Sequence, residues 1–374
     1  MVKILINAPK FYGIDESIKE AFDAIGFNAT LLNYGSKTTM QEKIARKTGL
    51  TIPHLKPLLN PLLKYYLEKE NKELVNTMKK EKPDLLFIIK GDHLFPETLK
   101  EIRNERSCPI IAYIWDDPFY SYAGLFADDF RKSNFEKGMH LYDFIFVYDT
   151  FYVEQMKKRG ISNVEYLPLA ADQNRYKKIE ISEEDRGKYS YEVCFVGTPY
   201  PKRIEVLEKL KHYNLGVFGD GWTKYFLEKG KATPSYYRGK AKGEKVLKIY
   251  LSSKIVLNIH DPEAREGLNS RTFDILACGA FEIVDHKKNL DIHLKNNIEI
   301  VSFENLKELN DIVNYYIHNP ELSNNIAERG RTKVLREHTW ENRIQKVIDT
   351  LLERNLMHRG GKQVESYRTL SSDD

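Results

Sequence analysis

The sequence consists of short, almost wholly apolar runs that alternate with helical patterns from one end to the other. In the first half such runs include Asp84–Ile89, Pro109–Ile114 and Asp143–Val147. Strands of this kind are covered on both faces, and their alternation with helices is typical of βαβ units in parallel sheets. The series begins again at Tyr191–Val196, after a charged stretch at 177–188. We therefore predict an α/β protein with two doubly wound domains.

The composition is that of a large globular chain and excludes several classes. A length of 374 residues corresponds to about two domains. The net charge of +4 is too small for a dedicated nucleic-acid-binding protein, and 12% aromatic residues argue against disorder. Cys108, Cys194 and Cys278 lie far apart in apolar stretches, which predicts buried thiols in a reducing compartment. The first apolar run is too short for a signal peptide and no run approaches a membrane span, so we expect a cytoplasmic protein.

The same patterns predict where the parts of the chain begin and end. We expect an N-terminal domain, a linker, a C-terminal domain, a crossing helix and a flexible tail, at 1–175, 176–190, 191–340, 341–357 and 358–374. Ligands of doubly wound sheets bind beyond the carboxyl ends of the strands. A cleft between the two domains is therefore the expected site.

The most informative segment follows the predicted strand at 254–259. Asn269 or Ser270 is placed to cap a short helix, whose N-terminus offers free N–H groups and Arg271 in its first turn, the ingredients of a phosphate site. Asp274 follows three residues later on the same face, and the two hydroxyls of a ribose would be partners for its carboxylate. The alternative is an ordinary cap, a surface charge and a solvated carboxylate.

A second loop with possible ligand contacts follows the first strand of the C-terminal domain. Gly197 would let the backbone approach a ligand, and Lys202 or Arg203 could neutralise a phosphate. The alternative is a turn stiffened by proline, with basic residues on the surface. After the next strand, Phe218 and Gly219 place flexible backbone beside an aromatic ring.

Several polar residues at the ends of predicted strands are candidates for acid–base chemistry. Asp116 or Asp117 could accept a proton from an acceptor hydroxyl, although the pair could equally close an Asx turn. Asp92 and His260 also follow predicted strands and are further candidates. Paired aspartates suggest a metal, but no third ligand accompanies them at suitable spacing, so we expect no metal.

One motif resembles a known family. The stretch Asn269–Ala280, N-S-R-T-F-D-I-L-A-C-G-A, is similar to the signature of CgeB-like glycosyltransferases. Weaker matches follow the same order along nearly the whole chain, at Lys90–Gly91, Trp115–Pro118, Phe195–Gly197 and Glu337–Arg343. The resemblance implies the GT-B fold, in which two Rossmann-like domains face each other across a cleft and the C-terminal one binds most of a nucleotide-sugar donor.

The resemblance also implies roles for individual residues. Arg271 would meet the diphosphate and Asp274 the ribose, although the family usually has glutamate at the latter position. Glu266 and Asp274, with seven residues between them, are similar to the E-x7-E element of many retaining GT-B enzymes, which makes Glu266 a catalytic candidate beside the alternative of a solvated loop carboxylate. Phe218 and Gly219 would border the base. A general base would come from the N-terminal domain, and no cofactor or metal ion would be required.

The predicted function is transfer of a sugar from a nucleoside-diphosphate-sugar donor to a hydroxyl of a glycan, lipid-linked or protein acceptor, as in the synthesis of cell-surface polysaccharides. The alternatives are a nucleotide-sugar epimerase and a non-catalytic glycan- or nucleotide-binding assembly protein. We expect no nucleic-acid partner. Residues 37–64 combine lysines and arginines with leucines, which indicates contact with an anionic membrane or, alternatively, a solvated helix pair.

Overall fold

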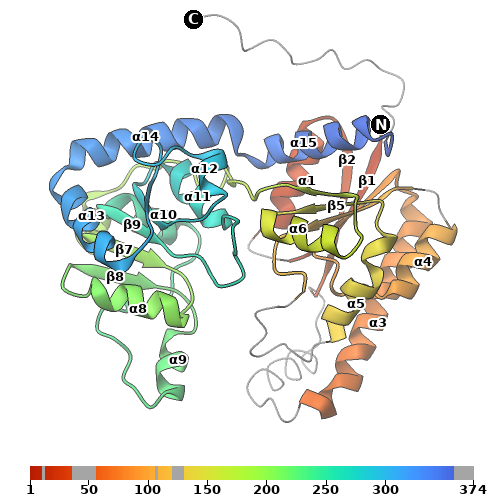
Figure 1. The fold of residues 1–374 in the computed structure, drawn as a ribbon, viewed down its shortest axis with the longest axis horizontal. Coiled ribbons are helices and arrows are strands. Elements are labelled where there is room, and N and C mark those ends of the chain that lie inside the picture. The colour runs from red at the N-terminus through yellow and green to blue at the C-terminus, as the bar shows by residue number, and fades with distance from the viewer. Residues whose placement is uncertain (11–12, 36–55, 106–107, 120–129, 358–374) are drawn as a thin grey trace, which may run out of the picture. The chain divides into compact units, whose positions relative to one another are not determined.

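Two sheets and their helices make up the part of the chain that the computed structural model describes, shown in Figure 1. The described residues are 1–10, 13–35, 56–105, 108–119 and 130–357. The predicted flexible tail at 358–374 therefore lies outside them. So does most of the predicted membrane-contact segment at 37–64, whose last residues begin a helix.

The first sheet has six strands in the order β2-β1-β3-β4-β5-β6. The strands are β1 Lys3–Pro9, β2 Asn28–Tyr34, β3 Leu85–Ile89, β4 Ile110–Ile114, β5 Phe144–Val147 and β6 Val164–Tyr166. β1 is parallel to β2 and β3, and β3 is parallel to β4. Every residue of β3, β4 and β5 is buried, which explains why these strands have uniformly apolar sequences.

The second sheet has five strands in the order β11-β10-β9-β7-β8. The strands are β7 Val193–Val196, β8 Leu215–Phe218, β9 Ile255–Asn258, β10 Glu282–Asp285 and β11 Val301–Phe303. All four neighbouring pairs are parallel. The chain passes from β7 to β8 on one side and then to β9 on the other, so the topological switch point lies between β7 and β9. A crevice at the carboxyl ends of these two strands is where such sheets bind ligands.

The helices alternate with the strands as predicted. They are α1 Ile14–Ala24, α3 Lys56–Glu81, α4 Pro96–Glu105, α5 Phe130–Gly138, α6 Thr150–Lys158, α7 Glu183–Tyr189, α8 Pro201–Lys209, α9 Trp222–Glu228, α10 Glu244–Ser252, α11 Ser270–Cys278, α12 Leu290–His293, α13 Leu306–His318, α14 Pro320–Glu337 and α15 Trp340–Glu353, with a 3₁₀ turn η2 at Met139–Leu141. The charged stretch at 177–188 contains most of α7, because Ser182 caps this helix by accepting from the Asp185 N–H at 3.1 Å.

Side chains of β7 enter two different hydrophobic clusters. Val193 and Phe195 join a cluster with side chains of α8 and α13, while Cys194 joins one with α10 and α11. Because successive residues of a strand point to opposite faces, the second sheet is covered on both sides. Cys108, Cys194 and Cys278 are all buried thiols, as predicted. Burial raises the pKa of the last two thiols to about 12, so they stay protonated at neutral pH.

The described residues form two compact units. The first unit draws on Met1–Ile114, Asp128–Ile145 and Ile344–Asp374, and the second on Trp115–Ala127 and Phe146–Arg343. Among the helices of the described ranges, none is both long and apolar enough to cross a membrane.

Candidate active site

Two glycine-containing loops meet at the carboxyl edge of the second sheet. Gly197 follows β7 and Gly219 follows the neighbouring strand β8. A Cβ atom at Gly219 would lie 2.1 Å from the carbonyl oxygen of Gly197, and Gly219 has a φ of 142°. The same carbonyl accepts a hydrogen bond of 2.8 Å from the indole nitrogen of Trp222. Only glycine fits at position 219, and the two loops are therefore held in direct contact.

Helix α11 begins at the same edge, after the loop that follows β9. The side chain of Asn269 caps the helix by accepting from the Thr272 N–H at 3.1 Å, and Gly279 ends it in the left-handed conformation. The cap at Asn269 and the short helix that follows it agree with the prediction. Ser270 and Arg271 occupy the first turn, whose free N–H groups carry the positive end of the helix dipole.

Arg271 lies between the helix and the loop after β7. Its Nη1 donates to the Asn258 side-chain oxygen at 3.3 Å, and its Nη2 lies 3.5 Å from where a Cβ of Gly197 would be. Within the described part of the chain, Arg271 forms no ion pair. Burial, and then the charge of Arg271, lower the pKa of Arg203 to about 10. Two guanidinium groups thus repel each other here, and an anion between or beside them would relieve that repulsion.

Lys202 and Arg203 are held by partners within the protein. The Lys202 ammonium forms an ion pair of 2.6 Å with Asp285 at the end of β10. Arg203 is buried and donates to the backbone oxygens of Ile259 and Thr198, each at 3.0 Å. Arg203 therefore joins the loop after β7 to the end of β9, at the switch point.

His260 is buried immediately after β9 and is paired with Asp285. One Asp285 oxygen contacts both the His260 backbone nitrogen, at 2.7 Å, and its Nδ1, at 2.8 Å. Burial alone would raise the pKa of Asp285, but His260 and Lys202 hold it well below its usual range. The carboxylate of Asp285 thus holds both the His260 ring and the Lys202 side chain at the carboxyl end of β10.

Asp274 lies one turn into α11 and is buried. Its Oδ1 accepts a hydrogen bond of 3.1 Å from the backbone nitrogen of Asp172. Burial raises the pKa of Asp274 well above its usual range, and the nearby charge of Asp172 acts in the same direction while that of Arg271 opposes it. The predicted neighbourhood of Arg271 and Asp274 on one helix face is therefore present, and the contact with a ribose stays a prediction.

The adjacent aspartates after β4 have different surroundings. Asp117 is buried, and its Oδ1 accepts from the Phe119 N–H at 2.9 Å, which is the Asx turn of the alternative interpretation. Asp116 is half-buried. Burial raises the pKa of Tyr148 far above its usual range, and the charges of Asp261 and Asp116 add to this rise. Asp116 is thus close in space to the loop that follows His260.

The two remaining carboxylate candidates lie in different units. Glu266 accepts from the Thr150 hydroxyl at 2.6 Å and forms an ion pair of 3.2 Å with Lys288. Asp92 is half-buried in the first unit, where burial and then the charge of Asp92 raise the pKa of Tyr142. In the described ranges there is no group of three or more His, Cys, Asp or Glu side chains arranged to hold a metal ion.

Comparison with known proteins identifies the family resemblance and the fold. Residues 202–349 match the family model described as glycosyl transferase-like. Spore protein CgeB of Bacillus subtilis (strain 168) is 23% identical over 273 residues, which cover 68% of this chain and 80% of that protein. Sucrose-phosphate synthase from Thermosynechococcus elongatus superposes with a TM-score of 0.66 at 11% identity, covering 95% of this chain and 99% of that one. The chain resembles CgeB and has the GT-B fold.

A further solved structure agrees with this result. Anabaena HepE, in complex with UDP-glucose, superposes on the CgeB-like chain with a TM-score of 0.64 at 12% identity, and the match covers 94% of this chain and 100% of HepE. At such low identities the likeness establishes the fold alone. The prediction of an α/β protein with two parallel-sheet GT-B domains is therefore confirmed.

Sequence reasoning assigned no role to three polar residues that organise this edge of the CgeB-like chain. Asn258 and Glu282 are buried polar residues at the end of β9 and the start of β10. Asp149 is also buried, and its carboxylate accepts from the backbone nitrogens of Arg265 and Glu266 at 2.9 and 3.0 Å. A polar residue inside or directly after an apolar run was the available signal, since a buried polar group requires a partner.

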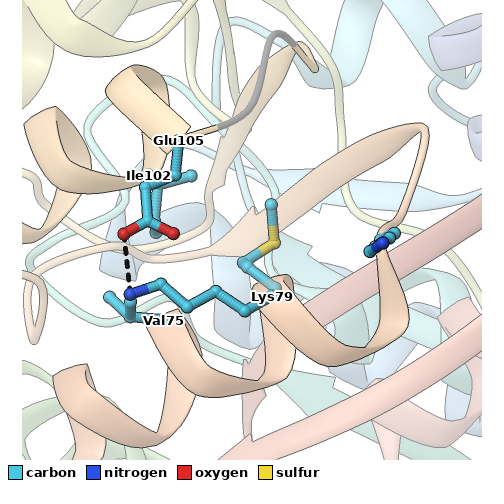
Figure 2. Close-up of a pocket in the computed structure, with 6 residues that line it drawn as sticks. Val75, Lys79, Ile102 and Glu105 are labelled. Carbon is cyan, nitrogen blue, oxygen red and sulfur yellow. Dashed lines mark ion pairs between the residues drawn. The ribbon is translucent and has the colours of Figure 1, made fainter.

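A small pocket lies elsewhere, in the first unit, and Figure 2 shows it. It has a volume of about 210 Å³, and an ion pair of 2.6 Å between Lys79 and Glu105 lies across it. Its lining residues are Val75, Met78, Lys79, Lys82, Ile102 and Glu105. Five of these residues come from the ends of α3 and α4, and Lys82 directly follows α3. Because these helices precede β3 and β4, the pocket lies toward the amino ends of those strands. It is therefore at the opposite edge from the one where parallel sheets bind substrates.

Proposed function

We propose that this CgeB-like chain is a glycosyltransferase that moves a sugar from a nucleoside-diphosphate-sugar donor to a hydroxyl of a glycan, lipid-linked or protein acceptor. The observation that carries the proposal is Arg271, a guanidinium without an ion-pair partner among the described residues, at the first turn of α11. It stands beside Gly197 at the switch point, where a diphosphate would meet both a cation and free N–H groups. The UDP-glucose complex of the fold neighbour HepE supports this choice of ligand.

In the proposed reaction, the bond between the sugar C1 and the diphosphate oxygen breaks while a bond from the acceptor oxygen to C1 forms. Negative charge grows on the departing diphosphate, where Arg271 and the α11 N–H groups would stabilise it. Asp116 would take the proton of the acceptor hydroxyl, because the carboxylate of Asp117 already closes a turn. Since Arg271 and the helix would carry the diphosphate charge, we propose no role for a metal ion, and activity should persist in excess EDTA.

Binding of nucleoside diphosphates tests the proposal most directly. A ligand at one hundred times its dissociation constant stabilises a protein by about 2.7 kcal/mol, so UDP, GDP, ADP, CDP and dTDP can be screened by thermal shift. Replacing Arg271 with alanine should weaken binding about tenfold to a hundredfold, because a hydrogen bond to a charged group contributes about 1.5–3 kcal/mol. Arg329→Ala, at an exposed position of α14, is the matched control and should bind normally.

Product analysis then distinguishes the predicted reactions. Release of the nucleoside diphosphate together with a sugar bound to an acceptor identifies a transferase. An altered sugar formed without any acceptor would indicate the epimerase alternative. Failure of all five diphosphates to shift the melting temperature would contradict every nucleotide-sugar function.

A further inference from the structure

A series of hydrogen bonds connects Arg271 to two buried polar side chains. Asn258 and Glu282, on the neighbouring strands β9 and β10, are 0% and 1% exposed. The side-chain nitrogen of Asn258 donates to Glu282 Oε1 at 2.8 Å, while its side-chain oxygen accepts from Arg271 Nη1 at 3.3 Å. The same oxygen also accepts from the Asn269 amide at 3.2 Å. Glu282 is thereby connected to the guanidinium through a single amide group.

Three acceptors determine which end of the Asn258 amide faces Arg271: its NH₂ group donates to Glu282 Oε1 at 2.8 Å, to the Thr272 hydroxyl at 3.0 Å and to the Asn269 side-chain oxygen at 3.1 Å. An amide has a donor end and an acceptor end, and a guanidinium can only donate. If the amide were reversed, its oxygen would face the Glu282 oxygen and its NH₂ group would face the guanidinium. The NH₂ group and the guanidinium, which can both only donate, would then repel each other. The observed orientation satisfies both partners at once and leaves Arg271 held by an acceptor.

Glu282 should lower the free energy of unfolding, which indicates that it has a role other than stabilising the fold. Its second carboxyl oxygen, Oε2, has no hydrogen-bond partner within the described part of the chain. Burial raises the pKa of Glu282 well above its usual range, which means that burial disfavours the charged carboxylate. An unsatisfied buried polar atom destabilises a fold, and replacing a buried ionisable group with an apolar residue of similar volume is often neutral or stabilising. An apolar residue would therefore suit this strand position better if packing were its sole purpose.

We propose that Glu282 and Asn258 are positioning residues that hold the guanidinium of Arg271 in place for the diphosphate of the donor. The inference rests on the proposed function for its ligand. Glu282 touches neither donor nor acceptor in this arrangement, and it acts through the amide of Asn258. Its loss should therefore weaken the contact with the diphosphate and leave contacts with the nucleoside unchanged.

Two variants of one residue test the proposal by titration calorimetry. The probes are UDP, GDP, ADP, CDP and dTDP, each compared with its own nucleoside. Glu282→Leu, which removes the shortest of the three acceptor contacts of the Asn258 amide, should weaken diphosphate binding about tenfold, equivalent to 1.4 kcal/mol, without changing nucleoside binding. Glu282→Gln retains an oxygen acceptor and should restore the wild-type affinity. Ile283→Leu, the next residue of β10, is the control for a general disturbance of the strand.

The melting temperature separates positioning from structural support. Glu282→Leu should unfold at the wild-type temperature or above it, because it removes an unsatisfied buried oxygen. Wild-type diphosphate affinity in Glu282→Leu would overturn the proposal. Equal weakening in the Leu and Gln variants, accompanied by a lower melting temperature, would also overturn it, since that is the result expected of a purely structural residue.

A second measurement keeps this test independent of the proposed function. In ¹⁵N-arginine-labelled protein, the guanidinium signal of Arg271 can be identified by its loss in Arg271→Lys. Slow rotation of that guanidinium in the wild type and in Glu282→Gln, with fast rotation in Glu282→Leu, would support positioning even if no diphosphate bound. The same fast rotation in all three proteins would refute it. If the wild type bound none of the diphosphates in calorimetry, that result would contradict the proposed function but not the positioning of Arg271.

Discussion

Two histidines near Phe273 of α11, the buried His338 and the half-buried His293, should make the second unit sensitive to acid. The rings of His293 and His338 are 5.2 Å apart, and that of His338 is 5.3 Å from Phe273 of α11. Arg343 Nη2 lies 2.7 Å from His338 Nδ1. Because a guanidinium always donates, this nitrogen of His338 must accept and the ring is neutral. The Tyr166 hydroxyl lies 2.7 Å from His293 Nε2.

The size of the effect follows from the altered pKa values. Burial, and then the positive charges of His338 and Arg343, lower the pKa of His293 to about 3. Burial and the charge of Arg343 lower the pKa of His338 to about 4. An unfolded histidine has a pKa of about 6.5. Below that pH, and above the lowered pKa values, these histidines are protonated in the unfolded chain but not in the folded chain. Each histidine should therefore cost the fold about 2 kcal/mol at pH 5 and almost nothing at pH 7.5.

Urea unfolding followed by tryptophan fluorescence measures this cost. Trp115, Trp222 and Trp340, the three tryptophans of the chain, all belong to the second unit. Relative to the wild type, His338→Gln should gain about 2 kcal/mol in unfolding free energy between pH 7.5 and pH 5, because glutamine does not titrate. His318→Gln, at an exposed position of α13, should show no such gain.

The comparison must be between variants and not between pH values alone. Burial raises the pKa of Asp274 and of Glu282, so the folded state holds protons that the unfolded state has lost. These two groups favour the fold as the pH falls, opposite in sign to the histidines. A relative gain for His338→Gln below about 1 kcal/mol, or an equal gain for His318→Gln, would refute the reasoning.

Three further predictions concern the candidate site. Gly219→Ala should abolish nucleoside-diphosphate binding and lower the melting temperature strongly. Gly230→Ala is the control, because Gly230 also has a positive φ but no atom lies within 4 Å of the added Cβ. This variant should lose only about 1 kcal/mol of unfolding free energy and bind nucleoside diphosphates normally. Asn269→Ala should destabilise the second unit by about 1 kcal/mol and weaken diphosphate binding, because α11 loses its cap. In kinetic assays with saturating donor, Asp116→Asn should lower turnover about a hundredfold or more, with unchanged affinity for the diphosphate. Asp117→Asn should retain activity, because the amide oxygen can still close the turn.

The elements of the fold were predictable because their signals are local. The uniformly apolar runs at β3 and β4 identify strands that are buried on both faces. α11 could be placed because its cap and its terminating glycine are both encoded in the sequence, at Asn269 and Gly279. α13 likewise begins after a residue suited to capping, since Asn305 accepts two backbone hydrogen bonds at its start.

The partners of the charged residues could not be predicted, because they depend on contacts between distant parts of the sequence. Lys202 pairs with Asp285, 83 residues away, and Arg203 contacts the backbone at Ile259, 56 residues away. From the sequence alone, both side chains were equally suited to bind a phosphate. The polar character of Glu282 in an apolar strand was visible, but its connection to Arg271 required the pairing of β9 with β10.

These pairings change how the proposed donor site would work. Of the three cations that the sequence offered for the diphosphate, Lys202 is neutralised by Asp285 and Arg203 is used to join two strand ends. Arg271 is therefore the cation of the three whose donors are least committed to partners within the protein, and it lies in the first turn of α11. A site that relies on this cation depends on its orientation, because its stabilising effect requires donors that already point at the developing charge. This dependence gives a physical reason for a buried carboxyl such as Glu282. It would lower the stability of the fold but hold the Arg271 guanidinium in the orientation that binds the diphosphate.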